Sequence, residues 1–139
     1  MRNSKPILLI EDDIADAMAV ETMLADLKVN NQVIWKRSAL QAIEFLKNNK
    51  DKKLALILLD LTLPDINGIE FLRTARNESI LQKTPVVVLT VSNDEQAIVE
   101  SFELSIAGYF VKKSKYENFK EIIDTIDRYW TFSELPCGE

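Results

Sequence analysis

Short runs of apolar residues alternate along the chain with longer segments in which apolar residues recur every three or four positions. The short runs are continuously apolar, a pattern typical of strands that are buried on both faces of a sheet. We therefore predict five strands, which lie at residues 6–10, 32–35, 54–59, 85–89 and 108–111.

The segments between and after these strands have the periodicity of amphipathic helices. The clearest is the last, whose apolar and aromatic residues share one helix face: Phe119, Ile122, Ile123, Ile126, Tyr129 and Trp130. Ser38 is placed to cap the second helix, and either Asn93 or Asp94 is placed to cap the fourth. The third helix is expected to follow Gly68.

Strand and helix thus alternate five times. This order predicts the α/β class, with a doubly wound, five-stranded parallel sheet covered by helices on both faces. A length of 139 residues suits one domain with its own core. No stretch rich in Gly, Pro or Ser divides the chain.

The composition narrows the chemistry that the chain can perform. It contains no histidine, which excludes histidine-based catalysis and histidine-bound metals, and its single cysteine, Cys137, rules out an internal disulfide. The 17 basic and 22 acidic residues give a net charge of −5, which argues against nucleic acid as a partner. No apolar run is long enough for a membrane span and the N-terminus does not look like a signal peptide, so we expect a cytoplasmic protein.

Candidate site side chains follow four of the five predicted strands, and the second strand is followed instead by Lys36 and Arg37. The candidates are Glu11, Asp12 and Asp13 after the first strand, Asp60 after the third, Thr90 after the fourth and Lys112 after the fifth. In a doubly wound sheet the binding site lies outside the carboxyl ends of the strands. We therefore expect these side chains to lie close together.

Taken one at a time, the acidic residues have simpler explanations. Asp13 fits a helix N-cap better than a ligand, and Asp16 lies in the first helical turn, where a negative charge suits the helix dipole. Taken together, clustered carboxylates need a cation, and a site made of oxygen ligands suits Mg²⁺. A carboxylate beside Mg²⁺ can attack phosphorus and form an aspartyl phosphate, whose oxygens a lysine and a hydroxyl would hold.

Four motifs contain these residues: LLIEDD, LILLDLTLPDINGIEFL, PVVVLTVS and AGYFVKKS. Together they make the chain resemble the receiver domain of two-component response regulators, from about residue 7 to residue 128. The resemblance implies a flavodoxin-like fold with five helices and the strand order 2-1-3-4-5. It also implies that the chain accepts a phosphoryl group from a sensor histidine kinase, with Mg²⁺ as cofactor and without any further enzymatic activity.

The resemblance assigns roles to the residues of the acidic cluster. Asp60 is the expected phosphoacceptor, Asp12 the direct Mg²⁺ ligand, and Glu11 a ligand that acts mostly through water. Thr62 would offer its backbone carbonyl to the metal. Glu11 departs from the family, in which aspartate is commoner at this position, and it adds one methylene group.

Three further residues take part in the expected response to phosphorylation. Lys112 would pair with the phosphoryl group, and Thr90 would act as a switch hydroxyl that is coupled to the ring of Tyr109. Val91 stands where the family usually has a small residue, so we expect it to crowd the acyl phosphate. Lys113 stands where proline is usual, at a bond that is typically cis in the family.

The C-terminal residues narrow the resemblance. Residues 126–136, IDRYWTFSELP, resemble the extension of stand-alone regulators that serve phytochrome-type histidine kinases. We expect a receiver domain at residues 1–128, a short extension at residues 129–139 and no output domain. Four residues are expected to lie beyond a closed core, where they would either fold back on the same chain or support a homodimer built on the fourth helix, fifth strand and fifth helix: Tyr129, Trp130, Phe132 and Leu135.

Three alternative functions fit the sequence less well than this interpretation. A phosphohydrolase that forms an aspartyl phosphate would carry a second aspartate two residues after Asp60, where this chain has Thr62, and would need a cap domain. A nucleotide-binding fold would need a glycine-rich loop after the first strand, where this chain has EDDIADA. A pseudo-receiver, which binds a partner without being phosphorylated, is disfavoured because acceptor, lysine and hydroxyl are all present.

Overall fold

The computed structural model describes residues 4–81, 83–112 and 118–132. Its strands are β1 (Ile7–Ile10), β2 (Val33–Lys36), β3 (Leu56–Leu59), β4 (Val86–Thr90) and β5 (Gly108–Val111). All neighbouring strands pair in parallel, in the order β2-β1-β3-β4-β5. The doubly wound parallel sheet and its strand order are therefore confirmed.

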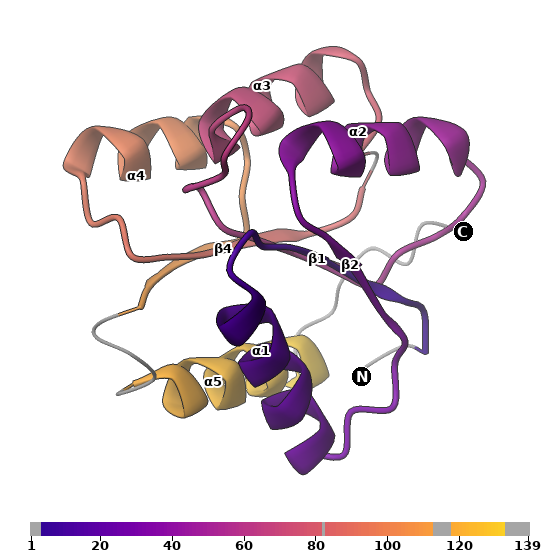
Figure 1. The fold of residues 1–139 in the computed structure, drawn as a ribbon, viewed down its shortest axis with the longest axis vertical. Coiled ribbons are helices and arrows are strands. Elements are labelled where there is room, and N and C mark those ends of the chain that lie inside the picture. The colour runs from indigo at the N-terminus through magenta and orange to yellow at the C-terminus, as the bar shows by residue number, and fades with distance from the viewer. Residues whose placement is uncertain (1–3, 82, 113–117, 133–139) are drawn as a thin grey trace.

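Helices cover both faces of this sheet. They are α1 (Ile14–Asp26), α2 (Ala39–Asn48), α3 (Gly68–Asn77), α4 (Glu95–Glu103) and α5 (Phe119–Phe132). Figure 1 shows α2, α3 and α4 on one face and α1 and α5 on the other. Within the described ranges, no helix combines the length and the apolar character that crossing a membrane requires.

Two apolar cores separate the sheet from its two helix layers. In β1, Leu8 and Ile10 pack into the core beneath α2, α3 and α4, whereas Ile7 and Leu9 pack into the core on the side of α1 and α5. Successive side chains of a strand point to opposite faces, so both sets must be apolar when both faces are covered. This double burial is the reason that the strands read as continuous apolar runs.

Side-chain caps mark the points at which the helices begin. Asp13 accepts a hydrogen bond from the backbone N–H of Asp16 and is the N-cap of α1, as predicted. Ser38 caps α2 by accepting from the N–H of Gln41, which is also as predicted. Of the two candidates for α4, Asp94 is the cap.

The last helix changes the interpretation of the C-terminal aromatic residues. α5 continues through residue 128, where the domain boundary was expected, and ends at Phe132. Trp130 was expected beyond the closed core, and this is wrong: its side chain is 1% exposed and packs with α1. It lies four residues after Ile126 and therefore on the same buried helix face. Leu135 lies outside the described residues.

Candidate functional site

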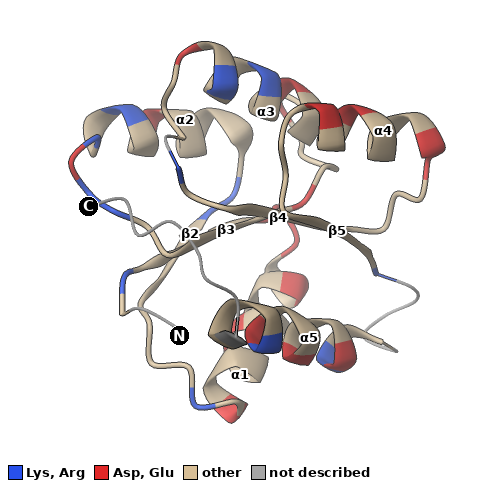
Figure 2. Ribbon diagram, turned by 180° about the vertical axis from the view of Figure 1, so that it is seen from behind, with Lys and Arg blue, Asp and Glu red and all other residues tan. Residues whose placement is uncertain are grey.

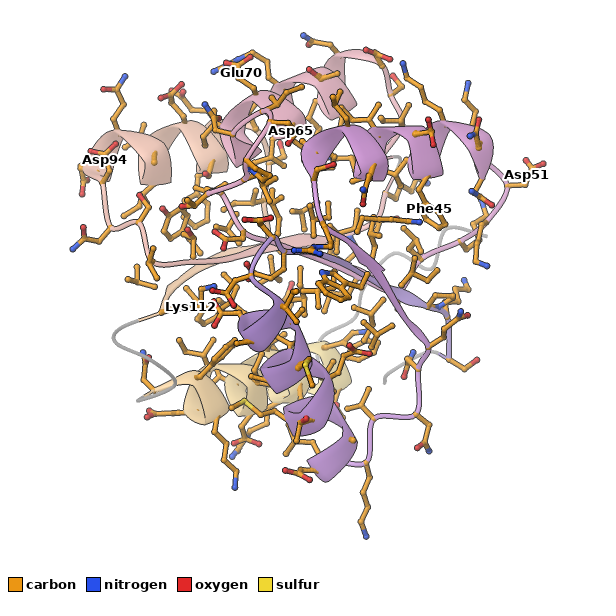
Figure 3. The ribbon with its side chains drawn as sticks, viewed as in Figure 1. Phe45, Asp51, Asp65, Glu70, Asp94 and Lys112 are labelled. Carbon is orange, nitrogen blue, oxygen red and sulfur yellow. The ribbon has the colours of Figure 1, made fainter. Side chains whose placement is uncertain are left out.

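The side chains predicted for the site meet at the carboxyl ends of β1, β3 and β5. The ammonium of Lys112 lies 3.1 Å from a carboxylate oxygen of Glu11 and 3.4 Å from one of Asp60. It lies closer still, at 2.8 Å, to Asp16 in the first turn of α1, and Figure 3 shows Lys112 beside this end of the helix. Glu11, Asp60 and Lys112 are buried. The structure thus joins three predicted residues and adds Asp16.

The loop after β3 fixes the position of Asp60. Its backbone N–H donates to the carbonyl of Ile10 in β1 at 3.0 Å, and its carboxylate accepts from the N–H of Thr62 at 2.9 Å. Gly68, at the start of α3, packs directly against this loop, and a Cβ atom there would lie 2.6 Å from the Cα atom of Leu61. Only glycine allows this approach, so Gly68 helps to set the orientation of Asp60.

Strand β2 supports the backbone of the acidic pair. The N–H of Glu11 donates to the carbonyl of Lys36 at 3.0 Å, and the indole N–H of Trp35 donates to the carbonyl of Glu11 at 2.7 Å. The guanidinium of Arg37 lies over the Trp35 ring and reaches the carbonyl of Asp12 at 3.4 Å. Trp35 was not predicted as a site residue from the sequence. An indole at the carboxyl end of a strand is the signal that points to this role.

The cluster carries an excess of negative charge. Burial, reinforced by the neighbouring charge of Asp60, raises the pKa of Glu11 to about 8 even though Lys112 acts in the opposite direction. Burial tends to lower the pKa of Lys112, but the charges of Asp60 and Glu11 outweigh it and raise that pKa. Lys112 is therefore a cation at neutral pH, and the surrounding carboxylates favour a further positive charge.

The donor atoms at the site fit a hard divalent cation. Glu11, Asp12 and Asp60 offer only carboxylate oxygens, the type of ligand that Mg²⁺ and Mn²⁺ prefer. In the part of the chain that the structure describes, no three acidic, histidine or cysteine side chains are already gathered around one metal position. Instead, the ammonium of Lys112 contacts both Glu11 and Asp60. Metal binding therefore requires side chains of the site to rearrange.

The two predicted switch residues are connected through Ser92. Thr90 is fully buried at the end of β4, and its hydroxyl accepts from the N–H of Ser92 at 3.4 Å. The hydroxyl of Tyr109 donates to the carbonyl of the same residue at 2.8 Å. Ser92 was not predicted, because the contact from β5 to the loop after β4 cannot be seen in local sequence. Thr90 and Tyr109 therefore both contact the backbone of Ser92.

Val91, which departs from the pattern of the resemblance, belongs to this loop. Val91 is 58% exposed and lies at the surface next to the buried Thr90. Its expected crowding of the acyl phosphate stays a prediction. Lys113 and the geometry of the bond that precedes it lie outside the described residues.

A family model of the response regulator receiver domain matches residues 7–124. The chain belongs to this family. Response regulator Rcp1 of Synechocystis sp. is 33% identical over 130 residues, which cover 91% of this receiver chain and 88% of Rcp1. The probable methanogenesis regulatory protein FilR2 of Methanothrix harundinacea is 30% identical, over 89% of this chain and 82% of FilR2.

Solved structures of receiver domains have the same fold. The phosphorylated cyanobacterial phytochrome response regulator RcpA superposes with a TM-score of 0.86 at 31% identity, covering 96% of this chain and 99% of RcpA. The Mn²⁺-bound form of Rcp1 superposes with a TM-score of 0.85 at 33% identity, covering 95% and 99%. This chain is thus a receiver domain of a two-component response regulator, and the comparisons do not favour the phosphohydrolase, the nucleotide-binding fold or the pseudo-receiver.

Proposed function

We propose that Asp60 accepts a phosphoryl group from a phosphohistidine of a sensor histidine kinase. A carboxylate oxygen of Asp60 attacks phosphorus, and the O–P bond forms as the N–P bond of the donor breaks. The imidazole leaves with the electron pair of that bond, and the product is an aspartyl phosphate. The observation that carries the proposal is the position of Asp60, which is buried at the end of β3 with the Lys112 ammonium 3.4 Å away.

The metal ligands of this receiver domain are proposed to be the carboxylates of Glu11, Asp12 and Asp60 and the backbone carbonyl of Thr62. A bound Mg²⁺ would supply positive charge that offsets these carboxylates and the phosphoryl oxygens. The oxygen-only donor set supports this assignment. The Mn²⁺-bound form of the relative Rcp1 also supports the assignment, since Mn²⁺ prefers ligands similar to those of Mg²⁺.

Lys112 and Thr90 are proposed to hold the phosphoryl oxygens. The ammonium is already within reach of Asp60, and the Thr90 hydroxyl lies at the end of the neighbouring strand. When Thr90 turns toward the phosphoryl group, its contact with the N–H of Ser92 is lost. Because Tyr109 is bonded to the carbonyl of Ser92, the same movement changes the environment of the tyrosine.

Incubation with acetyl phosphate and Mg²⁺, followed by intact mass measurement, tests the proposed function. We predict the mass increase of one phosphoryl group, which requires Mg²⁺ and disappears in Asp60→Asn. Asp65→Asn, a change in an exposed carboxylate of the same loop, is the matched control and should be labelled like the wild type. Labelling of Asp60→Asn at the wild-type level would contradict the assignment.

The partner is proposed to be a phytochrome-type histidine kinase in the cytoplasm. The support is the resemblance of residues 126–136 to regulators of such kinases and the likeness to the phytochrome response regulator RcpA. Phosphotransfer assays with kinases of different sensor types test this pairing. Equal rates with phytochrome-type and unrelated kinases would contradict it.

A homodimer on the face formed by α4, β5 and α5 is also proposed. The strand β5 is at the edge of the sheet, and the helices beside it expose the apolar or aromatic side chains of Val99, Phe102 and Tyr129. Figure 2 shows acidic residues along α4 and both signs of charge along α5. Since Trp130 is buried, it does not contribute to this surface.

A further inference from the structure

Asp16 is the carboxylate nearest to the Lys112 ammonium, yet it is neither the phosphoacceptor nor a proposed metal ligand. Their atoms lie 2.8 Å apart, compared with 3.1 Å for Glu11 and 3.4 Å for Asp60. The contact joins the first turn of α1 to the end of β5, which are separated by 96 positions in the sequence. It therefore connects two elements at the centre of the site.

Helix capping does not explain where the Asp16 carboxylate points. An acidic residue three positions after an N-cap often bonds back to the backbone N–H of the cap residue. Here that N–H, which belongs to Asp13, donates to the carboxylate of Glu11 at 3.2 Å. The Asp16 carboxylate instead turns toward Lys112.

A lysine ammonium has three N–H donors, and the site offers it the oxygens of three carboxyl groups. Glu11 holds the ammonium from the end of β1, and Asp16 holds it from α1. The third and longest contact is the one to the phosphoacceptor Asp60. The amine is thus anchored at two points and only loosely engaged at the third.

We propose that Asp16 is a positioning residue that holds Lys112 toward α1. In this position the ammonium makes only its longest contact, at 3.4 Å, with Asp60, so a smaller rearrangement frees the Asp60 oxygens for a metal ion and the phosphoryl donor. The inference rests on the proposed phosphorylation of Asp60 and adds a residue that acts on it through Lys112.

Removal of the Asp16 charge leaves the ammonium with Glu11 and Asp60 as its carboxylate partners in this cluster. The ammonium then moves toward both and competes with a metal ion for the same oxygens. It also reduces the nucleophilicity of the acceptor. Metal binding therefore weakens and phosphorylation slows, although Lys112 keeps two partners and the domain stays folded.

The test compares Asp16→Asn with Asp13→Asn, which removes an equal charge from the same end of α1. Asparagine is as good an N-cap as aspartate, so the control preserves the start of the helix. The measurements are the side-chain ammonium NMR signal of Lys112, the Mg²⁺ affinity by calorimetry and the rate of labelling by acetyl phosphate. We expect a shifted or lost Lys112 signal, Mg²⁺ affinity weaker by about tenfold and slower labelling in Asp16→Asn alone.

An unchanged Lys112 signal in Asp16→Asn overturns the inference, even if the Mg²⁺ affinity falls, because the affinity would then reflect charge at a distance. Equal effects of the two variants overturn it for the same reason. If the wild-type protein is not labelled at all, the proposed function fails. The Lys112 signal and the Mg²⁺ affinity still decide the role of Asp16 in that case.

Discussion

Glu11 is a buried carboxyl group between Asp60 and Lys112, and this position makes the stability of the metal-free protein depend on pH. Its pKa rises from 4.5 to about 8 on folding, mainly through burial and the charge of Asp60. Between these two values the folded protein keeps a proton that the unfolded chain has released. The free energy of unfolding therefore falls as the pH rises through this window, and the loss is complete above about pH 8.

We predict that Glu11→Gln stabilises the metal-free protein at about pH 9 by more than about 1.4 kcal/mol, the value of one pKa unit. The gain should shrink as the pH falls and should vanish well below 4.5, where Glu11 is protonated in both states. Urea unfolding in the presence of a chelator measures this gain in stability, and Glu21→Gln, on the exposed side of α1, is the control. Equal stability of Glu11→Gln and the wild type at about pH 9 would refute this prediction.

Trp35 is expected to affect metal binding through the backbone of Glu11. Trp35→Phe keeps an aromatic ring but removes the N–H that donates to the Glu11 carbonyl at 2.7 Å. Loss of one hydrogen bond is worth about 1 kcal/mol, so we predict that Mg²⁺ binds about fivefold more weakly. Calorimetric titration measures this, and Tyr129→Phe on the exposed face of α5 is the control. If the two variants bind Mg²⁺ equally well, Trp35 does not position the loop.

At the scale of elements, Asp65 links the loop after β3 to the start of α2, as Figure 3 shows. Its carboxylate accepts from the N–H groups of Ala39 at 3.1 Å and Leu40 at 2.9 Å. Ser38 accepts from the next N–H group of the same first turn, that of Gln41. Burial tends to raise the pKa of Asp65, but the donors of Leu40 and Ala39 help to outweigh it and lower the pKa.

We predict that Asp65→Ala lowers the free energy of unfolding at neutral pH by about 1 kcal/mol, the usual value of a helix cap. Because the pKa of Asp65 is lowered in the folded state, the difference should disappear in acid as the carboxylate is protonated. Chemical unfolding at neutral and acid pH measures both effects. Asp51→Ala, in an exposed turn, is the control, and an equal loss in that variant would show that capping is not the cause.

The elements themselves were predictable because their signals are local. Continuous apolar runs gave all five strands to within two residues, and capping chemistry gave Asp13 and Ser38. The contact of Asp16 with Lys112 was not predictable, because it depends on how α1 and β5 pack, 96 residues apart. The periodicity placed Trp130 on the apolar face of the last helix, but its part in the core was missed because residues 129–139 were taken as an extension of the domain.

At the scale of the whole molecule, the proposed homodimer predicts a mass twice that of one chain at high micromolar concentration. Phe102→Glu on α4 should shift the protein toward the monomer, because it places a charge in the apolar part of the interface. Leu40→Glu is the matched control, since Leu40 is 56% exposed and Phe102 51%, but Leu40 lies on α2. Light scattering measures both variants. A wild-type protein that is monomeric at this concentration rules the dimer out.

Chemical trapping of the phosphorylated residue tests the central claim most directly. Borohydride reduces an acyl phosphate to an alcohol, so a phosphorylated aspartate becomes homoserine. After treatment with acetyl phosphate and Mg²⁺, peptide mass spectrometry should find homoserine at position 60, and the neighbouring carboxylates Glu11 and Asp12 should be unchanged. Homoserine at another position, or its absence from position 60 in a protein that has taken up phosphate, would contradict the assignment of Asp60 as the phosphoacceptor.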